Sequence, residues 1–500
     1  MANTMAIKSL INIGFQSIEI DVECSLSNGL PSITIVGLAS KSVDEAKERL
    51  RVAITNSGYS FPRKRIIINL APADLPKDTA SLDLAIAIAL LQADGQLKVN
   101  LSNMFFIGEL SLDGSLRPVR GILGKLMSAY CQNATAVFIP KPNQQQASLT
   151  PNKNVFVASS LKEVIEHLSN TKPLQPLITS QKPPTMPITN PDFSDIYGQE
   201  MGKRALIIAA AGGHNVLLSG PPGTGKSMLA KAFIGILPTL TAKQAIETTH
   251  IHSLSSINFE KIITEPPLRS PHHTSSDVAL IGGGHNLRPG EISLAHNGIL
   301  FLDEMPEFNR RAIESLRQPL EDGLITIARA QQSAQLPARF ILIATSNPCP
   351  CGYLYSEKPC TCTAYQIQKY QKKLSGPIMD RIDIHVTIGQ VKHKNILKTS
   401  KEKSSPLFQS QVTKARILQN ERQLQKLNSA LSNNELKRYA SMNPVAEALL
   451  LRAAESLDLS ARSYIRTLKV ARTIADLEAS KTIEESHIAE ALQYRPKQQI

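Results

Sequence analysis

The segment NVLLSGPPGTGKSMLAK (residues 215–231) sets the architecture of this chain. Val216, Leu217 and Leu218 predict a short buried strand, and apolar periodicity resumes as a helix after a turn of glycine and proline. Such a turn cradles phosphate, because glycines let backbone N–H groups point inward and the new helix adds partial positive charge. The segment therefore predicts a nucleotide-binding α/β domain whose cradle comprises Gly220, Pro221, Pro222, Gly223, Thr224, Gly225, Lys226 and Ser227.

Four side chains have expected roles in ATP hydrolysis. Lys226 should reach the β- and γ-phosphates, and the Ser227 hydroxyl should ligate Mg²⁺. The apolar run GILFLDE (residues 298–304) predicts a buried strand with two carboxylates at its carboxyl end, where ligands bind open α/β sheets. We expect Asp303 to hold Mg²⁺ and Glu304 to polarise the attacking water. The alternative for this pair is an acidic helix cap after a core strand.

Composition narrows the class of protein. The chain has 500 residues, 42% hydrophobic and 19% charged, which is typical of a globular protein of about three domains. The sequence lacks an apolar run of membrane-spanning length, an export signal and the cysteine density of a disulfide scaffold. We therefore expect a cytoplasmic protein that does not enter membranes. The formal charge of +13 favours an anionic partner.

The N-terminal third has a core of its own. Apolar runs predict strands at 33–36, 66–70 and 105–107, and helices at 42–57 and 81–92. Sixteen Lys and Arg nearly balance fourteen Asp and Glu up to residue 170, so the charge excess lies elsewhere. The proline-rich stretch 171–196 predicts an extended linker.

Two segments of this region resemble a known family. GLASKSVDEAKERLRVAITNSGYSFPRKRIIINLAPADLPKD (37–78) and GELSLDGSLRPVRGIL (108–123) are similar to the N-terminal domain of the magnesium-chelatase-like ATPases of the YifB/ComM family. The resemblance implies an α+β domain with the fold of the Lon protease domain, which is S5 domain 2-like.

Protease activity is not expected from this domain. Lon-type proteases pair a serine after P-K-D-G-P with a lysine after a P-x-G-G-L run. Here Ser81 follows PKDTA, but Leu123 stands at the lysine position and Lys125 lies two residues further on. A serine nucleophile needs its base within hydrogen-bond reach. We expect instead that Ser81 caps its helix, with Asp83 in the first turn.

Resemblance to AAA+ ATPases assigns further residues around the nucleotide. Gln199, at a helix start before the phosphate loop, is placed near the adenine. Asn347 follows the apolar strand FILIAT and matches the sensor of the γ-phosphate. Arg381, in SGPIMDRID (375–383), resembles the arginine finger that reaches the γ-phosphate of a neighbouring subunit, so active sites would form between subunits of a ring. The alternative for Arg381 is an intrachain ion pair with Asp380 or Asp383.

Two insertions interrupt the predicted ATPase core. The first spans residues 250–296 and is rich in Gly, Ser and His, and the second, LITIARAQQSAQLPAR (324–339), predicts a β-hairpin with a polar tip at 331–333. They match the helix-2 insert and the insert before the first sensor of magnesium chelatases and MCM helicases. In relatives that move DNA, these loops point into the central pore.

Four cysteines form two close pairs. Cys349, Cys351, Cys360 and Cys362 give a C-x-C…C-x-C set with a Gly- and Pro-containing connection. Four thiolates satisfy a closed tetrahedral Zn²⁺ site, which we expect to brace the sensor loop without a catalytic role. The alternative is four reduced cysteines near a turn.

The last 110 residues carry most of the charge excess. Residues 391–440 contain eleven Lys and Arg against three Asp and Glu, which indicates either a phosphate contact zone or a solvated helical face. Periodicity then predicts three helices up to residue 494, the lid of an AAA+ module. Arg462 opens the middle helix after Ser460 and matches the second-sensor arginine, expected to touch the nucleotide of its own chain.

These observations predict four parts: a non-catalytic Lon-protease-like domain (1–170), a linker (171–196), an AAA+ core (197–390) and a basic segment with a helical lid (391–500). The YifB/ComM resemblance implies a hexameric homo-oligomer that uses ATP and Mg²⁺ to act on single-stranded or branched DNA. It further implies branch migration or helicase activity beside recombination proteins during natural transformation. Two alternatives stay open: a metal-chelatase motor subunit, which would normally lack the N-terminal domain and the cysteine pairs, and an ATP-dependent protease.

Overall fold

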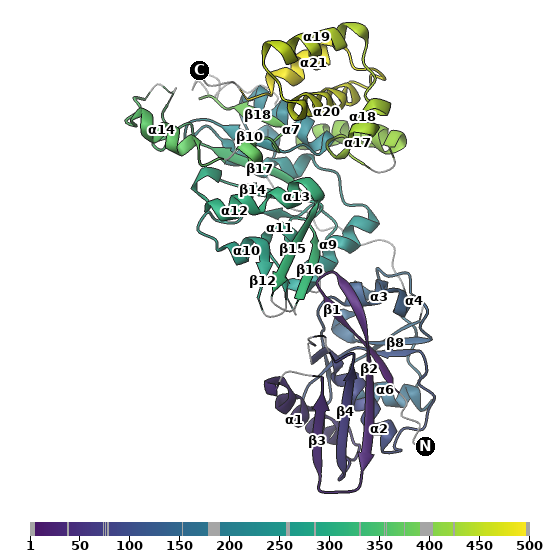
Figure 1. The fold of residues 1–500 in the computed structure, drawn as a ribbon. Coiled ribbons are helices and arrows are strands. Elements are labelled where there is room, and N and C mark those ends of the chain that lie inside the picture. Colours follow the sequence, from purple (N-terminus) through teal and green to yellow (C-terminus); the bar gives the residue numbers. More distant parts are fainter. Residues whose placement is uncertain are drawn as a thin grey trace.

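The computed structural model describes residues 6–37, 40–73, 75, 77, 80–152, 154–178, 191–256, 261–284, 287–329, 332–354, 356, 358–374, 376–390, 404–423 and 426–496. Figure 1 shows three parts that follow one another along the molecule: an N-terminal sheet, a second sheet with its helices, and a C-terminal group of helices. Among the described residues, no helix combines the length and apolar character needed to cross a membrane.

The N-terminal part is built on a seven-stranded mixed sheet in the order β3-β4-β2-β1-β5-β8-β9. The strands are β1 (Ile7–Ile13), β2 (Gln16–Ser27), β3 (Ser32–Val36), β4 (Arg65–Ala71), β5 (Met104–Phe106), β8 (Ala136–Pro140) and β9 (Val155–Ala158), with a small hairpin of β6 (Glu109–Leu110) and β7 (Leu116–Arg117). The three predicted strands are confirmed as β3, β4 and β5. The hairpin of β1 and β2, which pairs Ile13 with Gln16 at its turn, was not predicted.

Helices cover this sheet with apolar side chains. They are α1 (Ser40–Asn56), α2 (Asp83–Ala93), α3 (Ile122–Met127), α4 (Ala129–Gln132), α5 (Gln144–Ala147) and α6 (Leu161–Leu168). Helix α2 is buried on all sides from Asp83 to Leu91, as expected for a helix that is apolar all round.

The expected helix cap at Ser81 is wrong. Ser81 lies in a 3₁₀ turn, η1 (Ala80–Leu82), and the N-cap of α2 is Leu82. Asp83 is buried and accepts two hydrogen bonds from Arg49, at 2.6 and 3.0 Å, while its burial raises its pKa to about 6. Asp83 is therefore a core ion-pair partner. Lys125 lies in α3 and is buried. Pro76, Asp78 and Thr79 of the PKDTA run lie outside the described residues.

The predicted linker is anchored at both ends. The N–H of Leu177 donates to the carbonyl of Val155 in β9 at 2.7 Å, which adds the chain to the edge of the first sheet. Phe193, in η3 (Phe193–Asp195), is buried in the core of the second part, and its N–H donates to Ser405 Oγ at 2.9 Å. The second part thus begins before residue 197. Residues 179–190 lie outside the described residues.

The second part is built on five parallel strands in the order β11-β14-β17-β10-β18. They are β10 (Val216–Ser219), β11 (Leu268–Arg269), β14 (Ile299–Leu302), β17 (Ile341–Ser346) and β18 (Ile384–Thr387). The helices are α7 (Glu200–Gly212), α8 (Lys226–Ala232), α9 (Ala242–Ser255), α10 (Asp277–Ile281), α11 (Glu291–Leu294), α12 (Arg310–Ser315), α13 (Arg317–Asp322), α14 (Ala364–Gln371) and α15 (Gly376–Met379). This part therefore has an α/β fold with a parallel sheet, as the sequence predicted.

The first insertion contributes β11 to the core sheet, and the other strands of both insertions lie outside that sheet. The second is a hairpin of β15 (Leu324–Arg329) and β16 (Gln332–Pro337), which confirms the predicted hairpin. The predicted tip at 331–333 is wrong in part, because Gln332 and Ser333 pair with β15, and the connecting Ala330 and Gln331 lie outside the described residues. The first contains α10, α11 and a short hairpin of β12 (Gly282–Gly283) and β13 (Arg288–Pro289), and its opening histidines lie within α9.

The N-terminal domain packs against these insertions. His250 of α9 is buried, its ring lies 4.8 Å from the ring of Phe15 at the β1–β2 turn, and its Nδ1 accepts from the Gly124 N–H at 3.3 Å. A side chain at Gly124 would come within 2.3 Å of the imidazole, so this position requires glycine. At Gly14, a Cβ would lie 2.7 Å from that of Ala334 in β16. The β1–β2 turn therefore contacts both insertions of the core.

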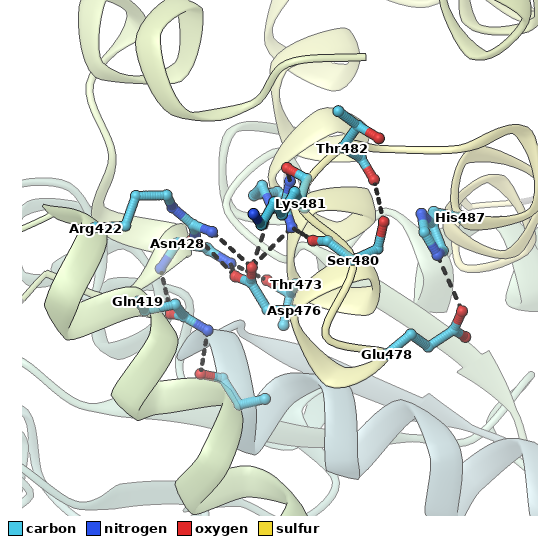
Figure 2. Close-up of polar contacts among 12 residues, drawn as sticks. Gln419, Arg422, Asn428, Thr473, Asp476, Glu478, Ser480, Lys481, Thr482 and His487 are labelled. Atoms are coloured by element: carbon cyan, nitrogen blue, oxygen red, sulfur yellow. Dashed lines mark hydrogen bonds and ion pairs between the residues drawn. The ribbon is translucent and has the colours of Figure 1, made fainter. Parts of the chain in front are cut away.

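Helix α17 joins the C-terminal helices to the core. The elements are α17 (Ser405–Gln423), α18 (Asn433–Tyr439), α19 (Pro444–Ser456), α20 (Ala461–Leu477) and α21 (Glu485–Gln493). Arg416 of α17 donates to the carbonyl of Ala210 in α7 at 2.7 and 2.9 Å. Figure 2 shows the buried carboxylate of Asp476 in α20, which accepts from Arg422 at 2.6 and 2.8 Å and from Asn428 at 2.8 Å. These charge-assisted bonds fix α20 to α17.

Candidate nucleotide-binding site

The phosphate loop connects the end of β10 with the start of α8. Gly223 and Gly225 have φ values of 76° and 87°, a left-handed conformation that strains other residues. Gly220 has a different constraint, because a Cβ there would lie 2.2 Å from the carbonyl oxygen of Ile388. These glycines allow the loop to turn tightly beside β18 and to present its N–H groups at the start of a helix.

Lys226 is held over this loop by three acceptors. Its Nζ donates to the carbonyls of Gly220 and Pro221 at 2.6 and 2.8 Å and to Asn347 Oδ1 at 3.2 Å. Burial of the ammonium lowers its pKa. The structure thus brings the phosphate-binding lysine and the proposed γ-phosphate sensor, which are 121 residues apart, into direct contact.

Asp303 gathers the groups expected around a magnesium ion. Ser227 Oγ donates to the two carboxylate oxygens of Asp303 at 3.2 and 3.0 Å. Thr345 Oγ1 donates to Asp303 Oδ1 at 2.6 Å and accepts from the Glu304 N–H at 2.8 Å. A hydroxyl and a carboxylate suit a hard divalent cation. Thr345 was missed by the sequence analysis, and its place at the end of the strand FILIAT was the available signal.

Glu304 has a strained backbone. Its φ is 52°, in the left-handed region that glutamate rarely adopts, and such a conformation costs on the order of 1–3 kcal/mol. Its Oε1 accepts a long bond from Asn347 Nδ2 at 3.4 Å. The strained residue lies at the carboxyl edge of the sheet, beside the phosphate loop, where ligands bind open α/β sheets.

Gln199 contacts the phosphate loop directly. It precedes α7 with a φ of 58°, and its Nε2 donates to the carbonyl of Thr224 at 3.2 Å and to that of Gly389 at 2.7 Å. It therefore joins the loop to the chain that leaves β18, and its expected place near the adenine stays a prediction.

Arg381 lies at the opposite edge of the sheet from the phosphate loop. The N–H groups of Asp383 and Ile384 both donate to the carbonyl of Asn215, so this segment lies where β10 begins, whereas the loop follows the end of β10. The four residues of β10 span about 13 Å. Arg381 forms an intrachain ion pair, but with Glu321 of α13. Asp383 instead accepts from Arg466 at 2.6 Å and contacts His214 at 3.2 Å.

Arg462 lies with Arg381 at this amino edge. Its guanidinium donates to the same Glu321 at 3.0 Å. The expected helix is confirmed, since α20 begins at Ala461 and Ser460 is its N-cap. The position differs from the expected one beside the nucleotide of its own chain. The reason is the way in which α20 is attached: Arg466 of this helix pairs with Asp383, which directly precedes β18.

The four paired cysteines form one cluster, the cysteine cluster. Their sulfurs lie within 4.8 Å of one another, with Cys349, Cys351 and Cys360 separated by 3.4 to 3.7 Å. Four thiolates about 2.3 Å from one zinc ion would be about 3.8 Å apart, so the spacing fits that ion. The backbone N–H groups of Cys351 and Leu354 donate to sulfurs at 3.4 Å, as is typical of metal thiolates.

The cysteine cluster also contacts the phosphate loop. Gly352, between the first pair and the rest of the connection, has a φ of 83°, and a Cβ there would lie 2.7 Å from Pro222. The cluster begins two residues after Asn347. It thus supports the sensor and the loop from the same side.

Part of the basic segment is used within the chain. Arg416 binds α7, Arg422 binds Asp476 and Lys426 binds Glu435 at 2.5 Å. Arg416 and Arg422 thus bind partners within the fold, whereas Lys426 and Glu435 form a pair on the surface, so at least two of the counted cations have structural roles. Residues 391–403, which carry five more lysines, lie outside the described residues.

Comparisons with known proteins cover nearly the whole chain. Three family models match: magnesium chelatase, subunit ChlI, over residues 192–396; subunit ChlI of Mg-chelatase over 22–143; and magnesium chelatase, subunit ChlI C-terminal, over 402–495. The chain is 42% identical to competence protein ComM of Haemophilus influenzae over 494 residues, 97% of this chain and 96% of the relative. It is also 42% identical to the uncharacterized protein YifB of Escherichia coli, over 97% of this chain and 95% of that one. The magnesium-chelatase 38 kDa subunit of Cereibacter sphaeroides is 29% identical over 31% of this chain and 52% of its own length.

Proposed function

Because this protein belongs to the ComM/YifB family of magnesium-chelatase-like AAA+ proteins, we propose that it is an ATP-hydrolysing hexameric motor that remodels branched or single-stranded DNA. The observation that carries the ATPase is the convergence of Lys226, Ser227, Asp303, Glu304 and Asn347 at one edge of the parallel sheet. The DNA substrate rests on the family relationship and on charge.

Each group has a distinct task when ATP is bound. The phosphate loop and Lys226 bind the β- and γ-phosphates, and Ser227 with Asp303 would hold Mg²⁺, which neutralises phosphate charge. Asp303 is kept in place by Thr345. Glu304 orients the attacking water and accepts its proton. Asn347, in contact with both Lys226 and Glu304, reports the presence of the γ-phosphate to the cysteine cluster that follows it.

The two edges of the sheet support our proposal of a ring. Arg381 and Arg462 lie together at the amino edge, about one strand length from the phosphate loop of their own chain. An arginine that stabilises transition-state charge must touch the γ-phosphate. We therefore assign both arginines to the site of the adjacent subunit, with Arg381 as the arginine finger.

DNA is the anionic partner that fits this assembly best. The chain has a formal charge of +13, and we take its β15–β16 hairpin and its first insertion as the counterparts of the pore inserts of DNA motors. The relative from H. influenzae is named a competence protein, which is consistent with a role beside recombination proteins in the uptake of DNA in the cytoplasm. The magnesium-chelatase subunits of Cereibacter sphaeroides and Chlorobaculum parvum each match 31% of this chain, against 97% for the competence protein, so we favour the DNA substrate over the chelatase alternative.

Purified protein should move the branch point of a synthetic four-way DNA junction when ATP and Mg²⁺ are supplied. Its activity should fall steeply with added salt, because each phosphate contact releases counterions. The measurement is conversion of labelled junction to product on a native gel, with Lys226→Ala as the inactive control. If the protein hydrolysed ATP but neither moved the junction, nor unwound a duplex, nor bound DNA, DNA remodelling would be rejected and the proposed ATPase would stand.

The cysteine cluster should hold one zinc ion per chain. Thiolate sites of this geometry bind zinc tightly, and the ion would brace Gly352 against Pro222 of the phosphate loop. Elemental analysis of anaerobically prepared protein should give a zinc-to-chain ratio near one, and Cys360→Ser should lower it together with thermal stability. A ratio near zero in the anaerobic protein would leave four reduced cysteines.

We assign no proteolysis to the N-terminal domain, for which we retain the Lon-like fold as a proposal. Leu123 occupies the position of the catalytic lysine, and it is buried in α3. The contacts of the N-terminal domain are consistent with a structural role, in which it packs against α9 and β16 of the proposed motor.

A further inference from the structure

Two arginines from different parts of the chain meet on one carboxylate. Glu321, in α13, receives Arg381 on Oε2 and Arg462 on Oε1, the latter at 3.0 Å. Arg381 precedes β18 and Arg462 opens the lid helix α20, so 81 residues separate them in the sequence. Each arginine takes a different oxygen of Glu321. The carboxylate therefore fixes the distance between the two guanidinium groups.

The environment of this trio differs from that of an ordinary surface ion pair. The side chain of Arg381 is 10% exposed and its NH1 donates to the carbonyl of Pro377 at 2.6 Å, whereas Glu321 and Arg462 are 50% and 41% exposed. Among the described residues, Arg381 Nε is buried without a hydrogen-bond partner. The hydrogen bond and charge of Arg381 lower the pKa of Glu321, so the carboxylate is ionised at neutral pH. The trio carries two positive charges and one negative charge, so it still attracts an anion.

We propose that Glu321 is a positioning residue for ATP hydrolysis at the adjacent subunit: it holds Arg381 and Arg462 as a spaced pair that receives the γ-phosphate of the neighbour. This inference rests on the ring ATPase proposed above and adds a residue to it. The bridge from α13 to α20 joins the core to the lid at the edge of the sheet remote from its own phosphate loop. Loss of the bridge should therefore impair a site in another chain.

The first test compares two glutamates of neighbouring short helices. Glu321→Gln removes the charge that holds both arginines, and displacement of a catalytic group by about 1 Å costs on the order of a hundredfold in rate. We expect kcat for ATP to fall at least about tenfold, while KM for ATP changes less than about twofold because the phosphate loop is remote. The matched control is Glu314→Gln, whose carboxylate pairs with Arg317 at 2.5 Å, and its kcat should stay at the wild-type value. Thermal unfolding and particle mass verify folding and assembly of each variant.

The second test separates a role in trans from a structural role. In a covalently linked dimer that assembles into rings, Glu304→Gln in the first subunit restricts hydrolysis to the second subunits, whose arginines come from the first. Adding Glu321→Gln to the first subunit should then lower turnover at least about tenfold. Adding it to the second subunit should leave turnover unchanged.

The outcomes separate this inference from the ring ATPase. Equal effects in both positions, an effect from the second subunit alone, or a homogeneous Glu321→Gln ring with wild-type or raised kcat would each overturn the inference. Absence of ATP hydrolysis by wild-type rings would instead reject the proposed ATPase.

Discussion

Glu304→Gln is expected to stop ATP turnover while ATP stays bound. The amide has nearly the shape of the carboxylate but cannot accept a proton from water, and general-base catalysis contributes about 10²- to 10⁴-fold. Thr345 and Ser227 hold Asp303 without help from the Glu304 side chain, so the expected magnesium ligands remain. Steady-state hydrolysis should fall at least about a hundredfold, and a filter-binding or fluorescence titration should give an ATP affinity close to that of the wild type.

A nearby acidic residue serves as the control for that experiment. Glu307 lies three residues on, in η5 (Met305–Glu307), and pairs with Lys373 at 3.1 Å on the surface. Glu307→Gln should hydrolyse ATP at the wild-type rate. If Glu304→Gln turned over ATP as fast as this control, the water-activating role would belong to another group.

Lys226→Ala is expected to abolish useful ATP binding. The ammonium is the cation that the loop carbonyls and Asn347 hold at the centre of the cradle. Charge-assisted hydrogen bonds of this kind contribute about 1.5–3 kcal/mol each, so the loss of contacts to two phosphates should weaken ATP at least about a hundredfold. Equilibrium titration with a fluorescent ATP analogue measures the affinity, and hydrolysis should fall to background.

The control for this change lies in the same helix. Lys231 is an exposed cation in the last turn of α8, and Lys231→Ala should bind ATP as the wild type does. Because Lys226 is buried, thermal unfolding must show that the alanine variant is folded at the assay temperature. A folded Lys226→Ala protein with wild-type affinity would contradict the assigned cradle.

Local patterns predicted the parts of the site that depend on neighbouring residues. The phosphate loop needs glycines, a lysine and a hydroxyl within eight positions, and the carboxylates of Asp303 and Glu304 directly follow an apolar strand. The strand of FILIAT and the hairpin of residues 324–337 were predictable for the same reason. The β1–β2 hairpin had a usable pattern as well, since alternating apolar residues follow Gly14 and Phe15 at the turn.

Contacts between distant segments could not be predicted from local sequence patterns. Thr345 on Asp303, Glu321 on two arginines and His214 beside Asp383 each join residues tens to hundreds of positions apart. Arg462 is the clearest case. Periodicity located its helix, but the edge of the sheet that the helix approaches depends on Arg466 meeting Asp383, 83 residues away. The charge count over 391–440 had the same weakness, because Arg416 and Arg422 bind partners within the fold.

The contact of His250 with the N-terminal domain has a consequence for how this protein can be divided. Phe15 and Gly124 enclose an imidazole that belongs to the second part of the chain, and Gly14 lies against Ala334 in β16. A fragment trimmed at the proline-rich linker would leave this histidine and the adjoining apolar side chains facing water, a surface prone to self-association. The boundary that the linker suggests in the sequence therefore does not separate two independently packed parts. An insoluble fragment that lacks the N-terminal part would not show that the intact protein is inactive.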